Sequence, residues 1–228
     1  MEFVVGIARC NEPRALLEET LEALRASRLP PSQILIVDNG DEPLHATPHA
    51  VPYTAVRPER NVGCAGGWNM LCDLAGDTSI VLLNSDCAVA PDTFERMYDA
   101  PEPALVCALG FSCFRLDSAI RKQIGPFDEE FYPAYFEDAD YRRRCSLGGV
   151  EIIDWPYEPE CIVSPGRTRF RSGIVHGWYE PGSYHGWAGD KFKWFHERLE
   201  ANRLRYIAKW GGVPNAETYR SPFDERRD

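Results

Sequence analysis

The sequence lacks any long apolar run, which argues against a membrane-spanning helix. None of its apolar stretches approaches the roughly 18–20 residues that such a helix needs. The first residues, MEFVVGIARCNEP, have neither a basic lead nor an extended apolar core, so we expect no signal peptide there. The sequence therefore predicts a soluble, cytoplasmic protein and leaves peripheral contact with the inner face of a membrane open.

An excess of positive charge is also missing. The chain has 25 Lys and Arg against 35 Asp and Glu, which gives a formal net charge of −10. Proteins that bind nucleic acid usually carry basic surfaces, so we expect no nucleic-acid partner. An acidic protein that binds phosphate groups needs a local device, such as a bound cation or a ring of backbone N–H groups.

The spacing of the cysteines lacks the pattern of a zinc knuckle. The chain has eight cysteines, but no two of them are separated by only two residues. Several lie in apolar runs, as Cys72 does, where cysteine behaves as a small hydrophobic residue. We therefore expect buried free thiols and a reducing compartment.

The first half of the chain alternates strand and helix patterns. Short apolar runs predict strands at residues 3–8, 34–37, 53–56 and 80–83. Helices are expected after Pro13, from the Gly-rich stretch 61–67 to about residue 75, and after Pro91. The alternation predicts an α/β fold in which helices flank a mostly parallel central sheet.

The second half is less regular. Strands are expected at 105–109 and 150–155, and helices at 118–124, 137–147 and 190–210. Residues 156–189 are rich in Pro, Gly, His and aromatic residues, which favours an ordered functional loop or a lid. We expect one continuous domain over residues 1–212 and a polar C-terminal tail over residues 213–228.

Acidic residues stand where two expected strands end. Asp38 follows ILIV, and Asp86 follows IVLLNS. Open parallel sheets bind ligands at the carboxyl ends of their strands. In an extended segment Asn84 and Asp86 point the same way, which suits a divalent cation held against phosphate oxygens. Asp38 alone equally suits the capping of a turn.

Six segments together resemble the family-two glycosyltransferases, which have a GT-A fold, and especially their bacterial rhamnosyltransferase-like branch. In the order of that family they are VVGIARCNEP, ILIVDNGD, RNVGCAGGWNMLCDLAGD, IVLLNSD, FDEEFYPAYFEDADYRRRCSLGG and NRLRYIAKWGG. The resemblance implies an inverting enzyme of polysaccharide or glycoconjugate synthesis. Such an enzyme moves a sugar from a UDP- or dTDP-sugar onto a hydroxyl of a carbohydrate or glycolipid acceptor.

The resemblance also assigns roles to residues and to the two halves of the domain. It implies a nucleotide-binding half at about 1–100 and an acceptor-side half at about 101–212. Mn²⁺ or Mg²⁺ is expected at Asp86, with His176 or, as the alternative, His185 from a late loop. Asp138 is expected to be the general base, with Glu137 orienting the acceptor. Donor binding is expected at Ala8, Asn11, Asp38, Asn61, Gly66, Asn69, Asn84 and Ser85.

One position departs from the family pattern. The metal-binding element of that family is Asp-x-Asp, whereas this chain has Asn84-Ser85-Asp86. Its first position therefore carries no charge, and the expected metal site rests mainly on Asp86.

The chemistry of sugar transfer agrees with this assignment. The reaction needs a stabilised diphosphate leaving group and a base near the acceptor hydroxyl. Adjacent residues on a helix point about 100° apart, so only one of Glu137 and Asp138 is expected to face the reacting carbon. These acids can also simply complement a helix N-terminus.

Other functions stay open at this point. The first is a catalytically inactive module that binds nucleotide-sugars. The second is a sugar-phosphate nucleotidyltransferase, although ARCNEPRALLEE lacks the Gly-rich loop with Arg and Lys that this class needs. A dinucleotide-dependent oxidoreductase is disfavoured because no G-x-G-x-x-G follows the first strand.

Overall fold

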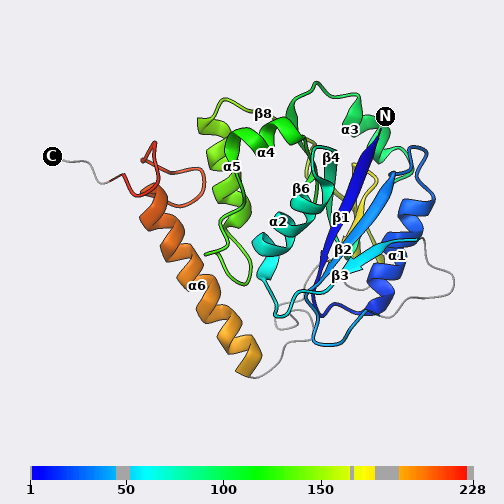
Figure 1. The fold of residues 1–228 in the computed structure, drawn as a ribbon, viewed down its shortest axis with the longest axis horizontal. Coiled ribbons are helices and arrows are strands. Elements are labelled where there is room, and N and C mark those ends of the chain that lie inside the picture. The colour runs from blue at the N-terminus through cyan, green and yellow to red at the C-terminus, as the bar shows by residue number, and fades with distance from the viewer. Residues whose placement is uncertain (1, 45–51, 165–166, 178–189, 225–228) are drawn as a thin grey trace.

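A computed structural model describes residues 2–44, 52–164, 167–177 and 190–224, and the statements below concern these ranges. Its main body is a seven-stranded sheet with helices on both faces (Figure 1). The strand order is β3 (Thr54–Val56), β2 (Gln33–Asp38), β1 (Phe3–Arg9), β4 (Ser79–Asn84), β7 (Cys113–Leu116), β6 (Ala104–Phe111) and β8 (Glu151–Asp154). Of these seven strands only β7 runs antiparallel to its neighbours, which confirms the predicted mostly parallel α/β sheet.

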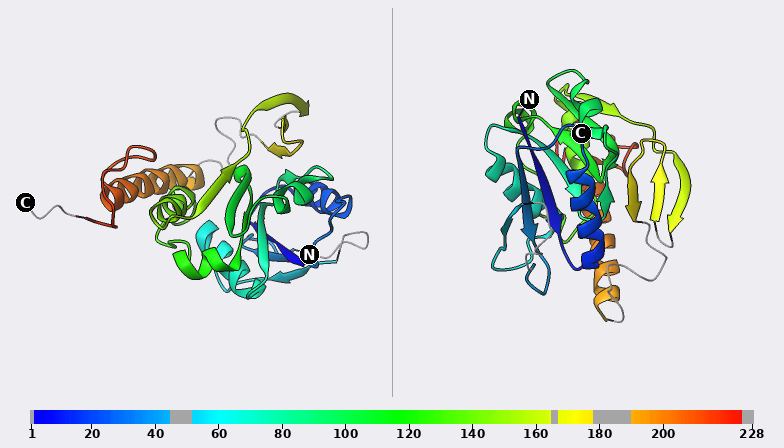
Figure 2. Two further views of the ribbon diagram at one scale, coloured as in Figure 1. Left: turned by 90° about the horizontal axis from the view of Figure 1, so that it is seen from above. Right: turned by 90° about the vertical axis from the view of Figure 1, so that its right-hand side faces the viewer.

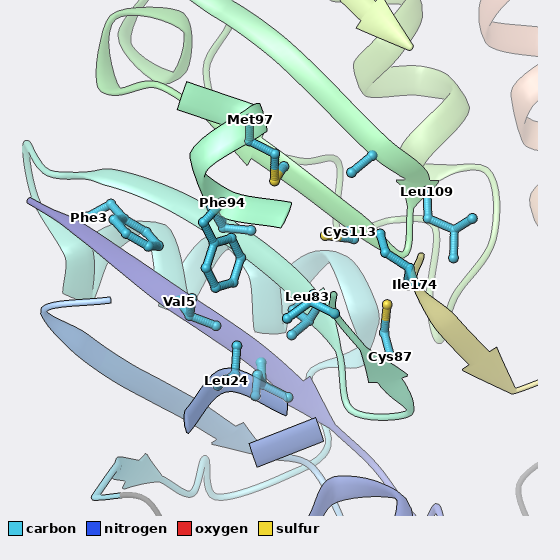
Figure 3. Close-up of a cluster of buried hydrophobic side chains, with 14 of the residues drawn as sticks. Phe3, Val5, Leu24, Leu83, Cys87, Phe94, Met97, Leu109, Cys113 and Ile174 are labelled. Atoms are coloured by element: carbon cyan, nitrogen blue, oxygen red, sulfur yellow. The ribbon is translucent and has the colours of Figure 1, made fainter. Parts of the chain in front are cut away.

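The first face of the sheet is covered by α1 (Arg14–Arg25) and α3 (Thr93–Tyr98). Alternate side chains of the strands point to this face and pack against Leu17, Leu21 and Leu24 of α1. Figure 3 shows Phe3, Val5, Leu24, Leu83 and Phe94 gathered in this core. Burying large apolar side chains of this kind contributes roughly 1.5–3 kcal/mol each, so this layer fixes α1 on the sheet.

The opposite face is covered by α2 (Gly63–Ala75), α4 (Ser118–Ile124) and α5 (Glu137–Leu147). Trp68 of α2 is in contact with Phe114 and Phe127, and Phe127 stacks on Tyr141 of α5. Helix α2 ends at Ala75, as predicted, and the positive φ of 57° at the next residue, Gly76, suits a residue without a Cβ. The predicted bounds of α4 and α5 agree with the structure.

Strand β7 is the one strand of the main sheet that the sequence pattern did not indicate. Its sequence, CFRL, places Arg115 in the middle of a short run, which hides the apolar signal. The structure buries this side chain fully. Its guanidinium donates hydrogen bonds to the backbone oxygens of Met97 and Pro101 and to Asp117, so the buried charge is paired.

The prediction of a loop over residues 156–189 is wrong for the part that the structure describes. That part forms β9 (Pro159–Ser164), β10 (Arg167–Phe170) and β11 (Val175–Gly177), which join β5 (Cys87–Ala88) in a four-stranded sheet. Figure 2 shows the three yellow strands beside the main body. Such short strands are stable only with a partner, and their partner β5 lies far away in the sequence.

Helix α6 (Asp190–Trp210) begins and ends as predicted and lies outside the sheet layers, against α5 (Figure 1). Trp210 donates to Asp140 of α5 through its indole N–H, over 2.9 Å. The chain then folds back, because Thr218 and Tyr219 donate their N–H groups to the carbonyl of Trp210. In the described ranges neither α6 nor any other helix is long and apolar enough to cross a bilayer.

Candidate functional site

The carboxyl ends of β1, β2 and β4 lie side by side. The parallel register pairs Arg9 with Asp38, and Ala8 with Asn84. Three segments that the sequence singled out separately are thereby brought to one edge of the sheet. This edge is where open α/β sheets bind ligands.

A cavity of about 280 Å³ lies at this edge. Residues from the strand ends form part of its wall, and α2, the start of α5 and α6 contribute the rest. Of the predicted site residues, the cavity is lined by Ala8, Asn61, Asn84, Ser85, Asp86, Glu137 and Asp138. The structure therefore brings the expected metal-side and base-side carboxylates to a single cavity.

The backbone at Asn84-Ser85-Asp86 differs from the expected extended segment. Strand β4 ends at Asn84, and the next two residues form a turn. The carbonyl of Ser85 accepts a hydrogen bond from the buried hydroxyl of Thr20 on α1, over 2.9 Å, which anchors this turn. Asn84 and Asp86 nevertheless meet at one side chain, His176.

His176 lies on β11, where it pairs with Cys87 of β5. Its Nε2 is 3.3 Å from Oδ1 of Asp86 and 3.5 Å from Nδ2 of Asn84. The small sheet thus places the predicted histidine directly beside the predicted carboxylate. His185, the alternative ligand, lies outside the described residues.

The chemistry of this group suits a divalent cation that also binds substrate. Within the described ranges no cluster of three or more His, Cys, Asp or Glu side chains could hold a metal ion by itself. Asp86 and His176 offer one carboxylate and one imidazole, and ions such as Mg²⁺ usually complete their shell with phosphate oxygens and water. The residues present therefore fit a cation shared with a diphosphate.

Asp38 is already engaged by donors of the protein itself. Its carboxylate accepts hydrogen bonds from the N–H groups of Gly40 and Leu44 and from the guanidinium groups of Arg9 and Arg57. Burial alone raises the pKa of Asp38, but the two backbone amides and Arg9 lower it below its ordinary value. Asp38 thus holds Arg9, and Arg9 lines the cavity.

Asparagine side chains tie the loops of the cavity to each other. Asn11, just after β1, forms two hydrogen bonds of 2.8 and 3.1 Å with Asp41 in the loop after β2. Asn39 joins that loop to the start of α2, because its amide bonds the N–H of Val62 and the carbonyl of Gly63. Asn39 lines the cavity and had not been singled out from the sequence.

Four predicted donor residues do not line the cavity, namely Asn11 and Asp38, described above, and Gly66 and Asn69. Asn69 bonds both the N–H and the carbonyl of Phe127 and also reaches Glu129, on the side of α2 away from the strand ends. Gly66 is buried in α2, where an added Cβ would lie 2.9 Å from Cβ of Val62. Asn69 thus joins α2 to the segment around Phe127, whereas Gly66 leaves room for Val62 just before the helix.

The start of α5 carries Glu137 and Asp138. Glu137 is 4% exposed, and burial together with the nearby charge of Asp138 raises its pKa to about 8. The thiol of Cys64 on α2 hydrogen-bonds to it. Burial also raises the pKa of Asp138, while the backbone N–H groups around it, such as that of Ala139, oppose this rise. With this pKa, Glu137 is mostly protonated at neutral pH.

The backbone just before this helix is strained. Tyr135 and Phe136 both have positive φ, 74° and 75°, a conformation that is costly for large side chains. The amide of Asn202 on α6 donates to the carbonyl of Ala134 over 2.9 Å and lies 3.4 Å from that of Tyr135. Tyr135 also packs edge-on against Phe195 of α6. Helix α6 thereby holds the turn that delivers Asp138 to the cavity.

Several other lining residues were missed from the sequence. Arg9 is the last residue of β1, and Cys10 and Glu12 come just after it, so the strand-end rule that found Asp38 and Asp86 could have found them. Glu12 is buried and accepts a hydrogen bond from the N–H of Cys10. Phe195 reaches the cavity from α6, and no local pattern indicates this.

The family comparison covers most of this site. The family model described as "Glycosyl transferase family 2" matches residues 4–149, which include every strand end described above and the start of α5. No curated protein matches the chain.

Solved structures share the fold at low sequence identity. "Mannosyltransferase PcManGT from Pyrobaculum calidifontis in complex with GDP-Man and Mn2+" is 16% identical with a TM-score of 0.56, over 68% of this chain and 55% of that one. S. aureus TarS 1-349 in complex with UDP-GlcNAc is 12% identical with a TM-score of 0.56, over 90% of this chain and 66% of that one. The chain thus spans little more than half of the mannosyltransferase. At these identities the likeness shows the fold alone, which is of the GT-A type.

Proposed function

The chain belongs to glycosyl transferase family 2, and on that premise we propose that it transfers a sugar from a nucleoside-diphosphate-sugar to an acceptor hydroxyl. The proposal rests above all on one observation. A single cavity is lined by Asp86, which lies beside His176, and by Asp138 at the start of α5. Diphosphate binding and proton removal, the two needs of the reaction, thereby have candidate groups in one place.

The donor's diphosphate is proposed to bind at the Asn84-Ser85-Asp86 turn. Asp86 and His176 would hold Mn²⁺ or Mg²⁺ there, and the cation would offset the negative charge that develops on the departing diphosphate. The turn itself is anchored to α1 by Thr20. It therefore offers a fixed support for the diphosphate.

The nucleotide base is proposed to lie near the ends of β1 and β2. Asp38 acts there by fixing Arg9, since both oxygens of its carboxylate are engaged. Arg9 lines the cavity and offers N–H donors to the carbonyl oxygens of a pyrimidine. This supports a UDP- or dTDP-sugar as the donor. The related structures contain GDP-Man and UDP-GlcNAc, so the base and the sugar are open to experiment.

Asp138 is proposed to accept the proton of the acceptor hydroxyl while that oxygen attacks the anomeric carbon. Attack from the side opposite the leaving diphosphate inverts the anomeric configuration in a single displacement. Glu137 remains protonated near neutral pH because burial raises its pKa to about 8. Its part is to position the start of α5 and the acceptor.

The proposed catalytic domain covers residues 1–212, with the donor side in its first half and the acceptor side in its second. Its acceptor is a carbohydrate or glycolipid, as in polysaccharide synthesis by rhamnosyltransferase-like enzymes. A catalytically inactive module would bind the donor equally well. Slow release of nucleoside diphosphate from a nucleotide-sugar without acceptor would identify an active enzyme.

A thermal-shift screen of nucleoside diphosphates and their sugars, with and without Mn²⁺, tests the donor side. A ligand that binds only the folded chain raises Tm by mass action. We expect at least one nucleotide to raise Tm more strongly with Mn²⁺. In Asp86→Ala the Mn²⁺-dependent gain in affinity should fall roughly ten- to a hundredfold.

The matched control is Asp77→Ala, which removes an exposed carboxylate just before β4 begins. This variant should keep the full effect of Mn²⁺. Metal-dependent affinity that survives in Asp86→Ala would remove this residue from the metal site. A screen in which no nucleotide shifts Tm would contradict the proposed function.

A further inference from the structure

A second cavity of about 510 Å³ lies next to the donor cavity. Phe111 and Asp138 line both cavities, so the two meet at the proposed base. The wall of the second cavity comes from α5, from the ends of β6 and β8, from α6 and from the segment after α6. We call this second cavity the α5 groove.

The α5 groove extends along its helix. Asp138, Arg142 and Ser146 follow one another at intervals of four residues and therefore share one helix face. At a rise of 1.5 Å per residue, Asp138 and Ser146 lie about 12 Å apart along the axis. A groove of this length is longer than a single hexose ring and leads to the proposed base at one end.

Most of the charged groups that line the α5 groove are bonded to other groups of the protein. Arg142 forms a two-pronged ion pair with Asp154. The guanidinium of Arg143 donates to the carbonyl of Tyr219 over 2.8 Å. Glu217 accepts a hydrogen bond from the hydroxyl of Tyr206. Within the described residues the lining has three carboxylates, Asp138, Asp154 and Glu217, against the two guanidinium groups, so the groove carries no excess of positive charge.

This chemistry decides what kind of molecule the groove suits. A phosphate group needs an excess of positive charge or a nest of N–H groups. Neutral hydroxyls both donate and accept, so they match carboxylate oxygens, guanidinium N–H groups, the amide of Asn215 and the hydroxyl of Ser146. The lining favours a molecule with many hydroxyls and no charge.

We propose that the α5 groove binds a neutral oligosaccharide acceptor, extended along α5 with the reacting hydroxyl at Asp138. This assignment rests on the proposed glycosyl transfer, because it takes Asp138 as the base. Asp154, Tyr206, Asn215 and Glu217 lie beyond residue 149, where the match to the family ends. With Pro214, five of the twelve residues that line the groove therefore lie outside that match.

The test measures the direct binding of neutral trisaccharides (maltotriose, cellotriose and mannotriose) to the full chain by saturation-transfer NMR. Glycerol 3-phosphate serves as the anionic comparison. We expect at least one trisaccharide to bind, and we expect Ser146→Trp to abolish this binding because the new ring fills the groove. Asn215→Gly keeps the positive φ of 68° at this position and removes the amide, and should weaken binding by about tenfold.

Leu147→Trp is the matched control, because it adds the same ring to a neighbouring exposed position of α5 that does not line the groove. It should leave binding unchanged, and thermal unfolding should show that all three variants fold. The proposal is overturned if no trisaccharide binds, if Ser146→Trp binds like the wild type, or if glycerol 3-phosphate alone binds.

Calorimetry with nucleoside diphosphates on the same variants separates this proposal from the proposed function. Ser146→Trp should bind nucleoside diphosphate like the wild type while it loses the trisaccharide. Loss of trisaccharide binding with donor binding intact supports the groove. Absence of donor binding in the wild type contradicts the proposed function, whatever the trisaccharides do.

Discussion

The two sides of the cavity are built in different ways. On the donor side, Ala8, Asp38 and Asn84 stand at the ends of adjacent strands, and the parallel register alone places them together. On the base side, Asp138 follows two residues with positive φ, which α6 restrains through Asn202. The donor side depends on regular hydrogen bonding, and the base side depends on a strained turn with a distant support.

This difference indicates where each side is vulnerable. Strand pairing involves many backbone bonds, so a side-chain change at a strand end leaves its neighbours in place. Backbone strain of order 1–3 kcal/mol per residue persists only where the surroundings impose it. Changes in α6 should therefore affect the base side and spare the donor side.

The largest effect is expected for Asp138→Asn, which keeps the shape of the side chain and removes its basicity. Turnover should fall by roughly a hundredfold or more, the usual scale for losing a general base. Donor affinity should hardly change, because the proposed role of Asp138 is to act on the acceptor. The measurements are initial rates of transfer and calorimetric titration with the nucleoside diphosphate.

Glu137→Gln is the comparison for this variant. It should retain most of the transfer activity, because Glu137 is mostly protonated near neutral pH. The assignment moves to Glu137 if Asp138→Asn keeps near-normal transfer while Glu137→Gln abolishes it. A product that retains the anomeric configuration of the donor would rule out the single displacement itself.

A smaller effect is expected for Asn202→Asp, which keeps the size of the side chain but cannot donate to the carbonyls of Ala134 and Tyr135. The turn before α5 should relax and misplace Asp138, which should lower kcat by roughly tenfold or more. Donor affinity should stay at the wild-type value, since the strand ends are untouched.

Leu204→Ala, at an exposed position of the same helix, is the control for Asn202→Asp and should leave kcat unchanged. Equal losses of kcat and donor affinity in Asn202→Asp would show that α6 supports both sides of the cavity. The contrast between the two sides would then be wrong.

The same contrast explains how much of the molecule could be predicted from the sequence. The strand ends at Asp38 and Asn84 and the bounds of α5 follow from local apolar patterns, and the structure agrees with these patterns. The pairing of His176 with Cys87 and the support of Tyr135 by Asn202 join segments far apart in the chain, so no local pattern reveals them. The sequence predicted Asn69 to bind the donor, but in the structure its side chain accepts a hydrogen bond from the N–H of Phe127, a residue far away in the sequence.

The smallest effect concerns stability and tests the buried state of Glu137. Its carboxyl ionises near pH 4.5 in a model peptide and near pH 8 in the folded chain. Between these values the folded state binds a proton that the unfolded state has lost, so the free energy of unfolding must fall as pH rises. In this window the free energy of unfolding of the wild type should fall by up to about 1.4 kcal/mol per pH unit more than that of Glu137→Gln.

Urea unfolding at pH 5, 6.5 and 8 measures this difference, with Glu197→Gln on exposed α6 surface as the control. Parallel stability profiles for the wild type and Glu137→Gln would mean that Glu137 is ionised in the folded chain, and both carboxylates would then compete for the role of base.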